Sequence, residues 1–419
     1  MSPESASSGA FAEIDLDALC WNARCLKALT PEKTRFMAVV KADGYGHGAA
    51  EAARAAASAG ADFLAVARPE EAWDLLEAGI PDIPLLVFGR CPADMAAGLA
   101  SRGVRLTVSR LSEARELREA LDADRARAGR DLSLRVHVKV DTGMGRMGIP
   151  AHGSPGALTR AAAEIAAISR LPGVEREGLY SHFAAADERD KTHAHLQISR
   201  FRELLSALDA AGIDPGIRHM CNSAGIMELP EAHFDMVRAG ISLYGLYPSD
   251  EVDRSRVALK PVMCLKTRLV KVLPAPAGTC VSYGMTWKSP QDTLVGVAAL
   301  GYADGYPRLL SNTGEMLVRG VRAPIAGRVC MDLVMLDLGH IPDAAEGDEV
   351  IAFGRDAASG REISADELAR KIGTINYEIV SALTRRPPRC YRRGPDNAGA
   401  VSTGPARTDS GRRASVFQP

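Results

Sequence analysis

The sequence has no excess of charge of either sign. Its 419 residues include 51 lysines and arginines against 52 aspartates and glutamates, so the formal net charge is −1 with histidine neutral. This balance excludes the strongly basic surface of a nucleic-acid-binding protein and the composition of an acidic, disordered chain. Aromatic residues are scarce at 5%, but hydrophobic residues make up 46%, so we expect a folded chain with a large core.

Long apolar runs and paired cysteines are also missing. One of the longest apolar runs, Leu294–Ala303, is interrupted by two glycines and falls short of the ~18–20 residues of a membrane helix. The N-terminus has neither a basic nor an apolar segment, so we expect no signal peptide. The eight cysteines form no Cys-x-x-Cys pair, which disfavours a zinc site or a disulfide framework. We expect a cytoplasmic protein with free thiols and no membrane or nucleic-acid partner.

The length predicts two or three domains. Residues 1–10 and 394–419 are small, polar and without apolar periodicity, so we expect disordered tails there. From about residue 251 to 393 the chain becomes strand-rich and turn-rich, which predicts a mainly-β domain with one helix over Ser364–Ile372. Its predicted strands are Cys264–Leu273, Thr293–Leu300, Glu315–Arg319, Arg328–Leu338 and Asp348–Phe353.

Residues 11–250 alternate between short apolar runs and Ala-rich amphipathic stretches such as Ala49–Ala59 and Leu196–Ala211. Continuous apolar runs are typical of strands buried on both faces, and eightfold alternation with helices predicts a (β/α)8 barrel of the TIM type. An open doubly wound sheet is the alternative. The eight predicted strands are Phe36–Ala42, Asp62–Ala67, Ile83–Phe88, Arg105–Ser109, Ser133–Asp141, Gly178–Phe183, Ile217–Asn222 and Phe234–Arg238.

Five of these strands end in chemically active residues, and the carboxyl ends of barrel strands meet at one face, where active sites lie. Lys41 follows the first strand directly. Burial of its ammonium would be costly, and desolvation would lower its pKa and make it a base or a nucleophile. The alternative is a solvated lysine that has already left the barrel. The other strand-end residues are Lys139, Arg146, His182, Asn222, Ser223, Arg238, Gly240 and Ile241.

Ser223, Gly240 and Ile241 follow the last two strands, where barrels often hold a phosphate with hydroxyl and backbone N–H groups. A phosphate-bearing cofactor that condenses with a lysine is pyridoxal 5'-phosphate. In this interpretation Lys41 forms the Schiff base and Tyr45 reaches the phosphate. His182 lies against the cofactor ring and Arg238 lies near the pyridine nitrogen.

Arg238 also bears on the type of reaction. An arginine cannot accept a proton from the ring nitrogen, so the ring is a weaker electron sink, which favours removal and return of a proton over transamination. Racemisation needs acid–base groups on both faces of a planar carbanion. Lys41 can serve one face, and Tyr283 in the β domain is a candidate for the other. The alternative for Tyr283 is an ordinary tyrosine in a hairpin.

These motifs together resemble the alanine racemases, over roughly residues 11–393. The resemblance implies a pyridoxal phosphate-dependent racemase with an N-terminal α/β barrel and a C-terminal β domain. The matching segments, in order, are 38–48 (AVVKADGYGHG), 139–148 (KVDTGMGRMG), 181–184 (SHFA), 222–225 (NSAG), 238–245 (RAGISLYG), 282–287 (SYGMTW), 301–306 (GYADGY) and 327–332 (GRVCMD).

The resemblance implies a role for each matching residue. Lys41 and Tyr283 would be the bases for D- and L-alanine, with Tyr283 entering the active site of the other subunit of a homodimer. The cofactor would be held by Tyr45, His182, Asn222, Ser223, Arg238, Gly240 and Ile241, with His219 and Asp332 in support. The substrate would be held by Arg146 and Met331, with Tyr302 narrowing the entry. D-alanine would be made for peptidoglycan or degraded, and serine is an alternative substrate.

Two further points depend on the resemblance. The equivalent of Lys139 is carbamylated in many members, where it orients the substrate-binding arginine, and we expect the same here. The sequence also departs from the family pattern: Arg385 stands where some members carry a tyrosine near the phosphate, and Asp43 replaces a common asparagine. The first departure puts one phosphate contact in doubt, whereas the second should be tolerated.

Three other interpretations are weaker. Gly143-x-Gly145-x-x-Gly148 fits the dinucleotide-binding pattern, but it sits at the fifth strand and prolines and glycines follow where a helix should open. His193 and His195 could suggest a metal pair, but no third ligand is near, so we expect surface histidines. A non-catalytic cofactor carrier with a related barrel would lack the β domain and its tyrosine.

Overall fold

The computed structural model describes residues 9–394, so the predicted tails lie almost entirely outside the described residues. The chain forms two compact units, each built from more than one segment. The barrel unit comprises Asp15–Cys264 and Ile363–Leu383. The β unit comprises the residues up to Ile14, Leu265–Glu362 and the residues from Thr384 onward. This division differs from the predicted one, because residues 11–14 belong to the β unit, whereas residues 251–264 and 363–383 belong to the barrel unit.

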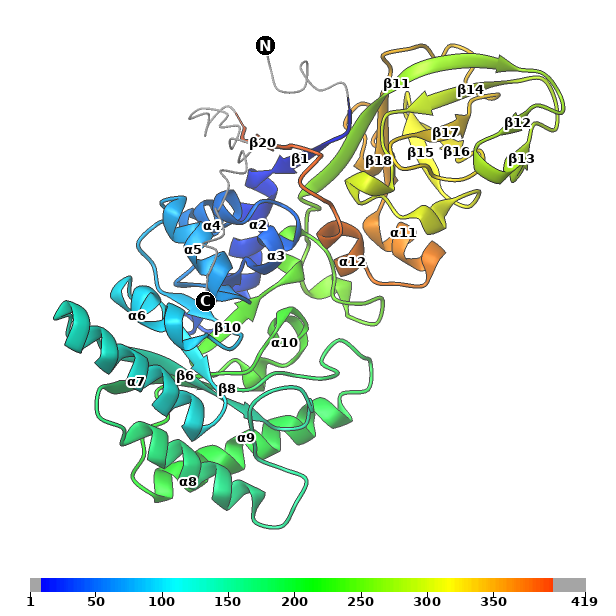
Figure 1. Cartoon of the computed structure of the whole chain (residues 1–419). Coiled ribbons are helices and arrows are strands. Elements are labelled where there is room, and N and C mark those ends of the chain that lie inside the picture. The colour runs from blue at the N-terminus through cyan, green and yellow to red at the C-terminus, as the bar shows by residue number, and fades with distance from the viewer. Residues whose placement is uncertain (1–8, 395–419) are drawn as a thin grey trace. The chain divides into compact units, whose positions relative to one another are not determined.

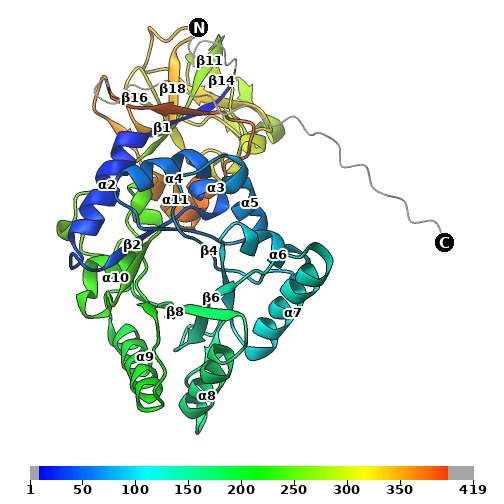
Figure 2. The ribbon, with the colours of Figure 1, turned by 90° about the vertical axis from the view of Figure 1, so that its left-hand side faces the viewer.

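The predicted (β/α)8 barrel is confirmed. Within the described residues, eight parallel strands pair in the order β5-β4-β3-β2-β10-β9-β8-β6, and a β5–β6 pairing closes the ring (Figures 1 and 2). The inner strands are apolar and almost wholly buried, as in the segment Phe36–Val39 of β2. The strands are β2 (Arg35–Val39), β3 (Phe63–Val66), β4 (Leu85–Val87), β5 (Arg105–Val108), β6 (Leu134–Asp141), β8 (Val174–Tyr180), β9 (Ile217–His219) and β10 (Met236–Ala239).

Helices surround this ring of strands (Figure 2). Several are rich in buried alanine, as at Ala52, Ala53, Ala55 and Ala56 of α4, and such small side chains allow close packing against neighbouring elements. The helices are α2 (Leu16–Ala28), α3 (Lys41–Tyr45), α4 (Ala49–Ser58), α5 (Pro69–Glu77), α6 (Ala93–Ser101), α7 (Leu111–Ala128), α8 (Ala157–Ser169), α9 (Thr192–Ala210) and α10 (Ser223–Glu228).

Shorter elements complete the barrel unit. The helix predicted over Ser364–Ile372 is observed as α11 (Ala365–Ile372), and the Ser364 hydroxyl accepts the Glu367 N–H at 3.0 Å, as a capping residue should. The other elements are α12 (Asn376–Ser381), the strand β7 (Ile149–Pro150) and the 3₁₀ turns η1 (Pro230–Ala232), η2 (Ile241–Tyr244) and η3 (Arg254–Arg256). In the part of the chain that the structure describes, no helix is both long and apolar enough to cross a membrane.

The β unit is a strand-rich body, as predicted. Its main sheet has the order β16-β15-β18-β11-β1-β20, and β14 pairs with both β11 and β17. Its elements are β1 (Phe11–Asp15), β11 (Met263–Ala275), β12 (Cys280–Val281), η4 (Tyr283–Met285), β13 (Trp287–Lys288), β14 (Thr293–Ala298), η5 (Tyr302–Asp304), η6 (Arg308–Leu310), β15 (Glu315–Val318), β16 (Val321–Pro324), β17 (Val334–Asp337), β18 (Glu349–Arg355), β19 (Glu362–Ile363) and β20 (Arg389–Arg392).

Candidate active site

A cavity of about 390 Å³ opens at the carboxyl ends of the barrel strands. Four of its lining side chains carry cationic groups, and none of its described lining residues is an aspartate or a glutamate. A cavity with this lining is suited to an anionic ligand. It is lined by Val39, Lys41, Tyr45, Ala67, Phe88, Gly89, Lys139, Arg146, Met147, Tyr180, His182, Asn222, Ser223, Arg238, Gly240, Ile241 and Tyr377.

Lys41 begins a turn whose following residues adopt the left-handed conformation. Ala42, Asp43 and Tyr45 all have φ near 53°, in the left-handed region. This conformation costs a non-glycine residue about 1–2 kcal/mol, and such strain gathers at functional sites. The turn brings Lys41 and Tyr45 into the same cavity, with the Lys41 Nζ 5.7 Å from the centre of the Tyr45 ring.

Glu71 of α5 holds this turn in place. One of its carboxylate oxygens accepts the Ala42 N–H at 2.6 Å, and the other accepts the N–H groups of Ala67 and Arg68, which follow β3. On the other side, the Asp43 carboxylate accepts the Ala49 N–H at the start of α4. An asparagine oxygen could accept the same hydrogen bond, which is a physical reason why Asp43 should be tolerated at this position.

The pKa of Lys41 is lowered, first by burial and then by the positive charge of Arg146, while the Glu71 carboxylate acts in the opposite direction. A lowered pKa increases the fraction of neutral amine, which is the form that acts as a nucleophile or a base. Lys41 is therefore only partly exposed and chemically activated, rather than the fully solvated lysine of the alternative interpretation.

A second group of residues forms a small polar cradle. The Ser223 hydroxyl accepts the N–H groups of Gly240 at 3.0 Å and Ser242 at 3.3 Å, which ties α10 to η2. A Cβ atom at Gly240 would lie 2.8 Å from the Tyr45 hydroxyl, so only glycine leaves this space open. Asn222 caps α10 by accepting the Gly225 N–H at 3.0 Å. The cradle thus places two hydroxyls close to the backbone at the start of a turn.

Arg238 is 3% exposed and is surrounded by neutral acceptors. Its guanidinium donates to the Ser181 and Met220 carbonyls at 2.9 Å, to His219 Nδ1 at 2.9 Å and to His182 Nδ1 at 3.0 Å. Burial lowers the pKa of Arg238 to about 10, so the group stays charged at neutral pH. Burial, and then the charge of Arg238, hold the pKa of His182 and His219 well below the usual value, so both rings are neutral.

Arg146 and Lys139 add positive charge to the cavity. Arg146 follows a turn in which the Asp141 carboxylate accepts the N–H groups of Gly143, Met144 and Gly145 at 2.8–2.9 Å. Lys139 is 6% exposed, and its Nζ lies 5.5 Å from the centre of the Tyr180 ring. Burial, and then the charges of Arg146 and Arg238, lower the pKa of Lys139 to about 8.

The remaining predicted residues lie in the β unit and gather on one part of it. The Tyr302 N–H donates to the Cys330 carbonyl at 3.0 Å, which places Tyr302 beside the segment with Met331. The Ser282 hydroxyl donates to the Arg328 carbonyl at 2.6 Å, which holds the turn with Tyr283 against the same segment. The Tyr283 side chain is 71% exposed and Met331 is 52% exposed. Asp332 pairs with Arg386 at 2.8 Å.

The sequence interpretation missed Tyr377. It assigned the tyrosine position near the phosphate to Arg385, but Tyr377 lines the cavity with its ring 6.2 Å from that of Tyr45. Arg385 is exposed and is not among the lining residues. The sequence does contain a tyrosine that could fill this position, because the same segment includes Asn376-Tyr377-Glu378. The departure that was assigned to Arg385 is therefore corrected: the segment does carry a tyrosine into this cavity.

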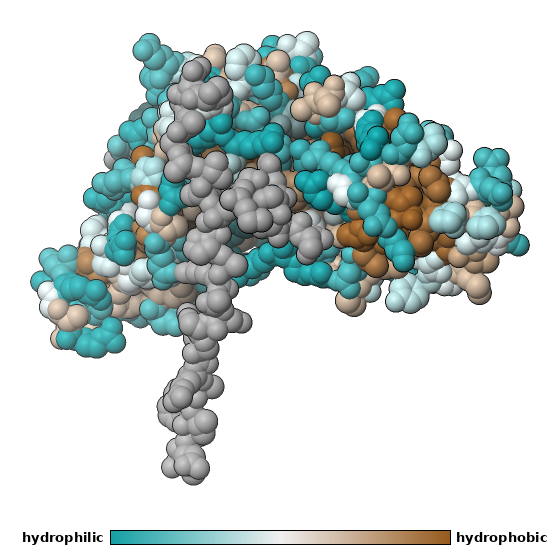
Figure 3. Space-filling model, turned by 90° about the horizontal axis from the view of Figure 1, so that it is seen from above, coloured by the Kyte–Doolittle hydropathy of each residue, from teal (hydrophilic) through white to brown (hydrophobic). Residues whose placement is uncertain are grey.

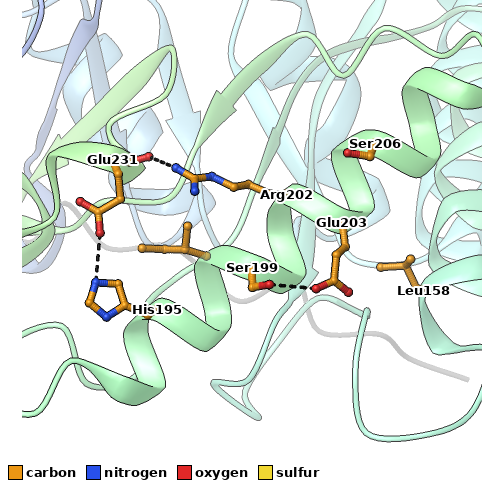
Figure 4. Close-up of a pocket in the computed structure, with 8 residues that line it drawn as sticks. Leu158, His195, Ser199, Arg202, Glu203, Ser206 and Glu231 are labelled. Carbon is orange, nitrogen blue, oxygen red and sulfur yellow. Dashed lines mark hydrogen bonds and ion pairs between the residues drawn. The ribbon is translucent and has the colours of Figure 1, made fainter.

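A second hollow, of about 650 Å³, lies outside the barrel between α8, α9 and η1 (Figure 4). Its polar side chains contact each other or the backbone: His195 lies 3.1 Å from Glu231, the Ser199 hydroxyl donates to Glu203 at 2.9 Å, and Arg202 donates to the Glu231 carbonyl at 2.9 Å. His193 contacts the Gly143 carbonyl instead of a shared ligand site. Within residues 9–394, no three His, Cys, Asp or Glu side chains form a group suited to a metal ion.

The glycine motif 143–148 does not open a helix. It forms the turn around Asp141, and the next helix, α8, begins only at Ala157. This local structure differs from the strand–turn–helix arrangement in which a dinucleotide's phosphates meet a helix N-terminus. The motif serves instead to carry Arg146 back to the cavity.

Comparison with known proteins gives consistent matches over most of the described chain. Residues 14–248 match the family model "Alanine racemase, N-terminal domain", and residues 262–391 match "Alanine racemase, C-terminal domain". An alanine racemase of Desulfosudis oleivorans is 50% identical over 393 residues, covering 93% of this chain and 98% of that protein. One of Methanococcus maripaludis is 41% identical over 382 residues, covering 91% and 98%.

Solved structures give the same result. The alanine racemase of Clostridium difficile 630 superposes with a TM-score of 0.84 at 35% identity, covering 92% of this chain and 96% of that one. The alanine racemase of Streptomyces coelicolor superposes with a TM-score of 0.82 at 39% identity, covering 93% and 99%. A structure from Bacillus anthracis with bound L-Ala-P has a TM-score of 0.82 at 35% identity, covering 92% and 96%.

Proposed function

Because the chain belongs to the alanine racemase family, whose members are pyridoxal phosphate-dependent isomerases, we propose that it interconverts L-alanine and D-alanine by a two-base mechanism. The observation that carries the proposal is the cavity at the strand ends. It combines a half-buried, activated lysine with three further cationic side chains and no carboxylate among its described lining residues. Such a site is complementary to an anionic cofactor and a small carboxylate substrate.

The residues of the cavity fit pyridoxal phosphate. The Tyr45 and Ser223 hydroxyls and the backbone at Gly240 and Ile241 would hold the phosphate, in space that a Cβ atom at Gly240 would fill. Lys41 would bind the aldehyde carbon, with His182, Asn222 and Arg238 around the ring. When bound, this cofactor withdraws electrons from the substrate Cα and so makes the Cα proton acidic.

Each side chain then has a separate task. The Lys41 amine would take and return the Cα proton of D-alanine, and the Tyr283 hydroxyl would do so for L-alanine on the opposite face. Arg146 and the backbone at Met331 would hold the substrate carboxylate. Arg238 cannot take up a proton from the ring, which favours return of the proton to Cα over transamination. Tyr302 would limit the size of the substrate side chain.

The proposal includes a homodimer. Tyr283, Met285, Leu309 and Met331 are each more than half exposed in the β unit, and Figure 3 shows hydrophobic residues gathered on the surface of this unit. Large exposed apolar side chains mark interaction surfaces. An exposed tyrosine can act as a base only where it enters a cavity, so we propose that Tyr283 of one subunit completes the site of the other.

A racemase assay tests the proposed function. The purified full-length protein, saturated with pyridoxal phosphate, is incubated with L-alanine and separately with L-serine, and the D-isomers are measured by chiral chromatography. We expect D-alanine from L-alanine with a higher kcat/KM than for serine, because Tyr302 would narrow the entry. Lack of turnover of both substrates would refute the proposal, and a preference for serine would favour the alternative substrate.

Mixing two inactive variants tests whether active sites are shared between subunits. Lys41→Ala and Tyr283→Phe remove different bases, so each homodimer should be nearly inactive. If each site combines Lys41 of one subunit with Tyr283 of the other, a hybrid dimer has one intact site. We expect activity to return after the two variants are unfolded and refolded together, but not after each is refolded alone. Mixtures that stay inactive although hybrid dimers form, as shown by tagged subunits, would contradict sharing.

Lys139 should carry a carbamate. Carbon dioxide reacts with a neutral amine, and the lowered pKa of about 8 gives Lys139 far more neutral amine near pH 7 than an ordinary lysine has. The resulting anion would lie near Arg146 and Arg238, whose positive charges already act on Lys139. A crystal structure at pH 8 with bicarbonate should show density beyond Nζ, and acid should release it. A bare amine at full occupancy would contradict the prediction.

A further inference from the structure

A series of hydrogen bonds runs from Arg238 through the interior of the barrel to the carboxylate of Glu177. Arg238 contacts His219 Nδ1 at 2.9 Å, and His219 Nε2 contacts His137 Nδ1 at 2.8 Å. His137 Nε2 then contacts a Glu177 oxygen at 3.2 Å. These side chains come from four neighbouring strands, β10, β9, β6 and β8, and both histidines are 0% exposed.

Arg238 and Glu177, at the two ends of this series, determine the direction of every hydrogen bond between them. An arginine can only donate, so His219 Nδ1 must be without a proton and His219 Nε2 must carry one. His219 therefore donates to His137 Nδ1, which leaves the His137 proton on Nε2. That proton is donated to Glu177, because an ionised carboxylate can only accept. Both histidines are thus held as the same tautomer, with the proton on Nε2.

The Glu177 end is held firmly. Arg105 of β5 donates to its two carboxylate oxygens at 2.8 and 3.0 Å. Burial by itself would raise the pKa of Glu177, but the hydrogen bonds from His137 and Arg105 outweigh burial and lower this pKa to about 2. Glu177 is therefore an obligate acceptor across the whole physiological pH range.

The neighbouring backbone leaves room for the pair of rings. A Cβ atom at Gly178 would lie 2.6 Å from His137 Nδ1, the atom that accepts from His219. The absence of a side chain at this position lets the two imidazoles meet in the barrel interior. Tyr180 stacks on His219, with ring centres 4.7 Å apart and ring planes within 7°, and fixes the plane of that ring.

We propose that Glu177 and His137 are positioning residues for the reaction: they fix the tautomer of His219 so that its bare nitrogen faces Arg238. The inference rests on the proposed function, in which Arg238 faces the cofactor ring. With the opposite tautomer, an N–H of His219 would point at an N–H of Arg238, and the guanidinium would lose one of its acceptors in a buried site.

The tautomers can be measured without any activity. In full-length protein labelled with ¹⁵N-histidine, with and without pyridoxal phosphate, NMR distinguishes protonated from bare ring nitrogens, and single His→Gln variants assign the signals. We expect a proton on Nε2 and a bare Nδ1 for both His137 and His219. A proton on His219 Nδ1 in the unmodified protein would overturn the inference, whether or not the protein proves to be a racemase.

Substitution tests the role of the carboxylate. The amide of Glu177→Gln can donate as well as accept, so it no longer imposes a direction, and we expect a mixture of tautomers at His219. Loss of one hydrogen bond to a charged group predicts a fall of roughly tenfold in kcat, with KM changed by no more than about twofold. Glu177→Asp, which keeps the obligate acceptor, should restore the tautomer and part of kcat.

Glu175→Gln is the matched control. Glu175 lies two residues earlier on the same strand and pairs with Arg135 of β6 at 3.1 Å, but this pair is on the surface. We expect no change in the histidine signals or in kcat. If Glu177→Gln leaves both the tautomers and kcat unchanged, or if Glu175→Gln has the same effect as Glu177→Gln, the positioning role is wrong.

Discussion

Lys41→Ala should abolish racemisation and binding of the cofactor through its aldehyde. Lys41 would act both as the covalent anchor and as one of the two bases, so we expect kcat/KM to fall by about 10⁴-fold or more. The absorbance band of the cofactor bound to the lysine should also be lost, while a band of non-covalently bound pyridoxal phosphate remains. The fall in rate and the change in spectrum are separate measurements on the same sample.

The geometry makes this loss specific. Lys41 lies just after the buried strand β2, and its amine is activated by burial and by Arg146, whereas Glu71 holds the turn through backbone N–H groups that the substitution leaves in place. The fold should therefore survive, and the melting temperature without cofactor should change little. Lys33→Ala, at an exposed lysine before the same strand, is the control and should keep full activity.

A small amine separates the chemical role from a structural one. Methylamine added to Lys41→Ala can occupy the space of the missing side chain and act as a base, so we expect partial recovery of activity that increases with amine concentration. The equivalent addition should have no effect on the unmodified protein. If Lys41→Ala keeps more than about a hundredth of the activity, another group must supply the base.

Much of the barrel half of the site could be predicted from the sequence, for a simple physical reason. Strands buried on both faces appear as continuous apolar runs, and the residues after such runs must gather at one end of a closed barrel. Lys41, His182, Ser223 and Arg238 were predicted to converge on this basis, and all four line one cavity. To predict that these residues converge, it was enough to know the apolar pattern of each segment and the residues at its end.

Other features depend on contacts between distant segments. The left-handed turn after Lys41 is stabilised by Glu71, about 30 residues away, and local preference would disfavour it for Ala42. Tyr377 reaches the cavity only because the segment 363–383 returns to the barrel unit after the β unit has been completed. The predicted boundary at residue 250 ignored that return, since helical periodicity does not say which unit a helix packs against.

Tyr283→Phe should separate proton exchange from racemisation. Removing one of two bases leaves the other able to exchange the Cα proton on its own face, but a full conversion needs both faces. In D₂O we therefore expect D-alanine to incorporate deuterium with retention of configuration, through Lys41, while L-alanine exchanges slowly. Racemisation should fall by about 10²–10⁴-fold in both directions, because the equilibrium constant between the two isomers cannot change.

The position of Tyr283 supports this expectation. Its turn is held by the Ser282 hydroxyl and by the Arg328 segment of the β unit, and the phenol itself is 71% exposed. The substitution therefore removes a hydroxyl that lies outside the core of its own subunit, so the stability of that subunit should change by no more than about 0.5 kcal/mol. Tyr247→Phe, which removes a hydroxyl that donates to the Val257 carbonyl, is the control. Equal deuterium incorporation into both isomers by Tyr283→Phe would mean that a different group serves the L-face.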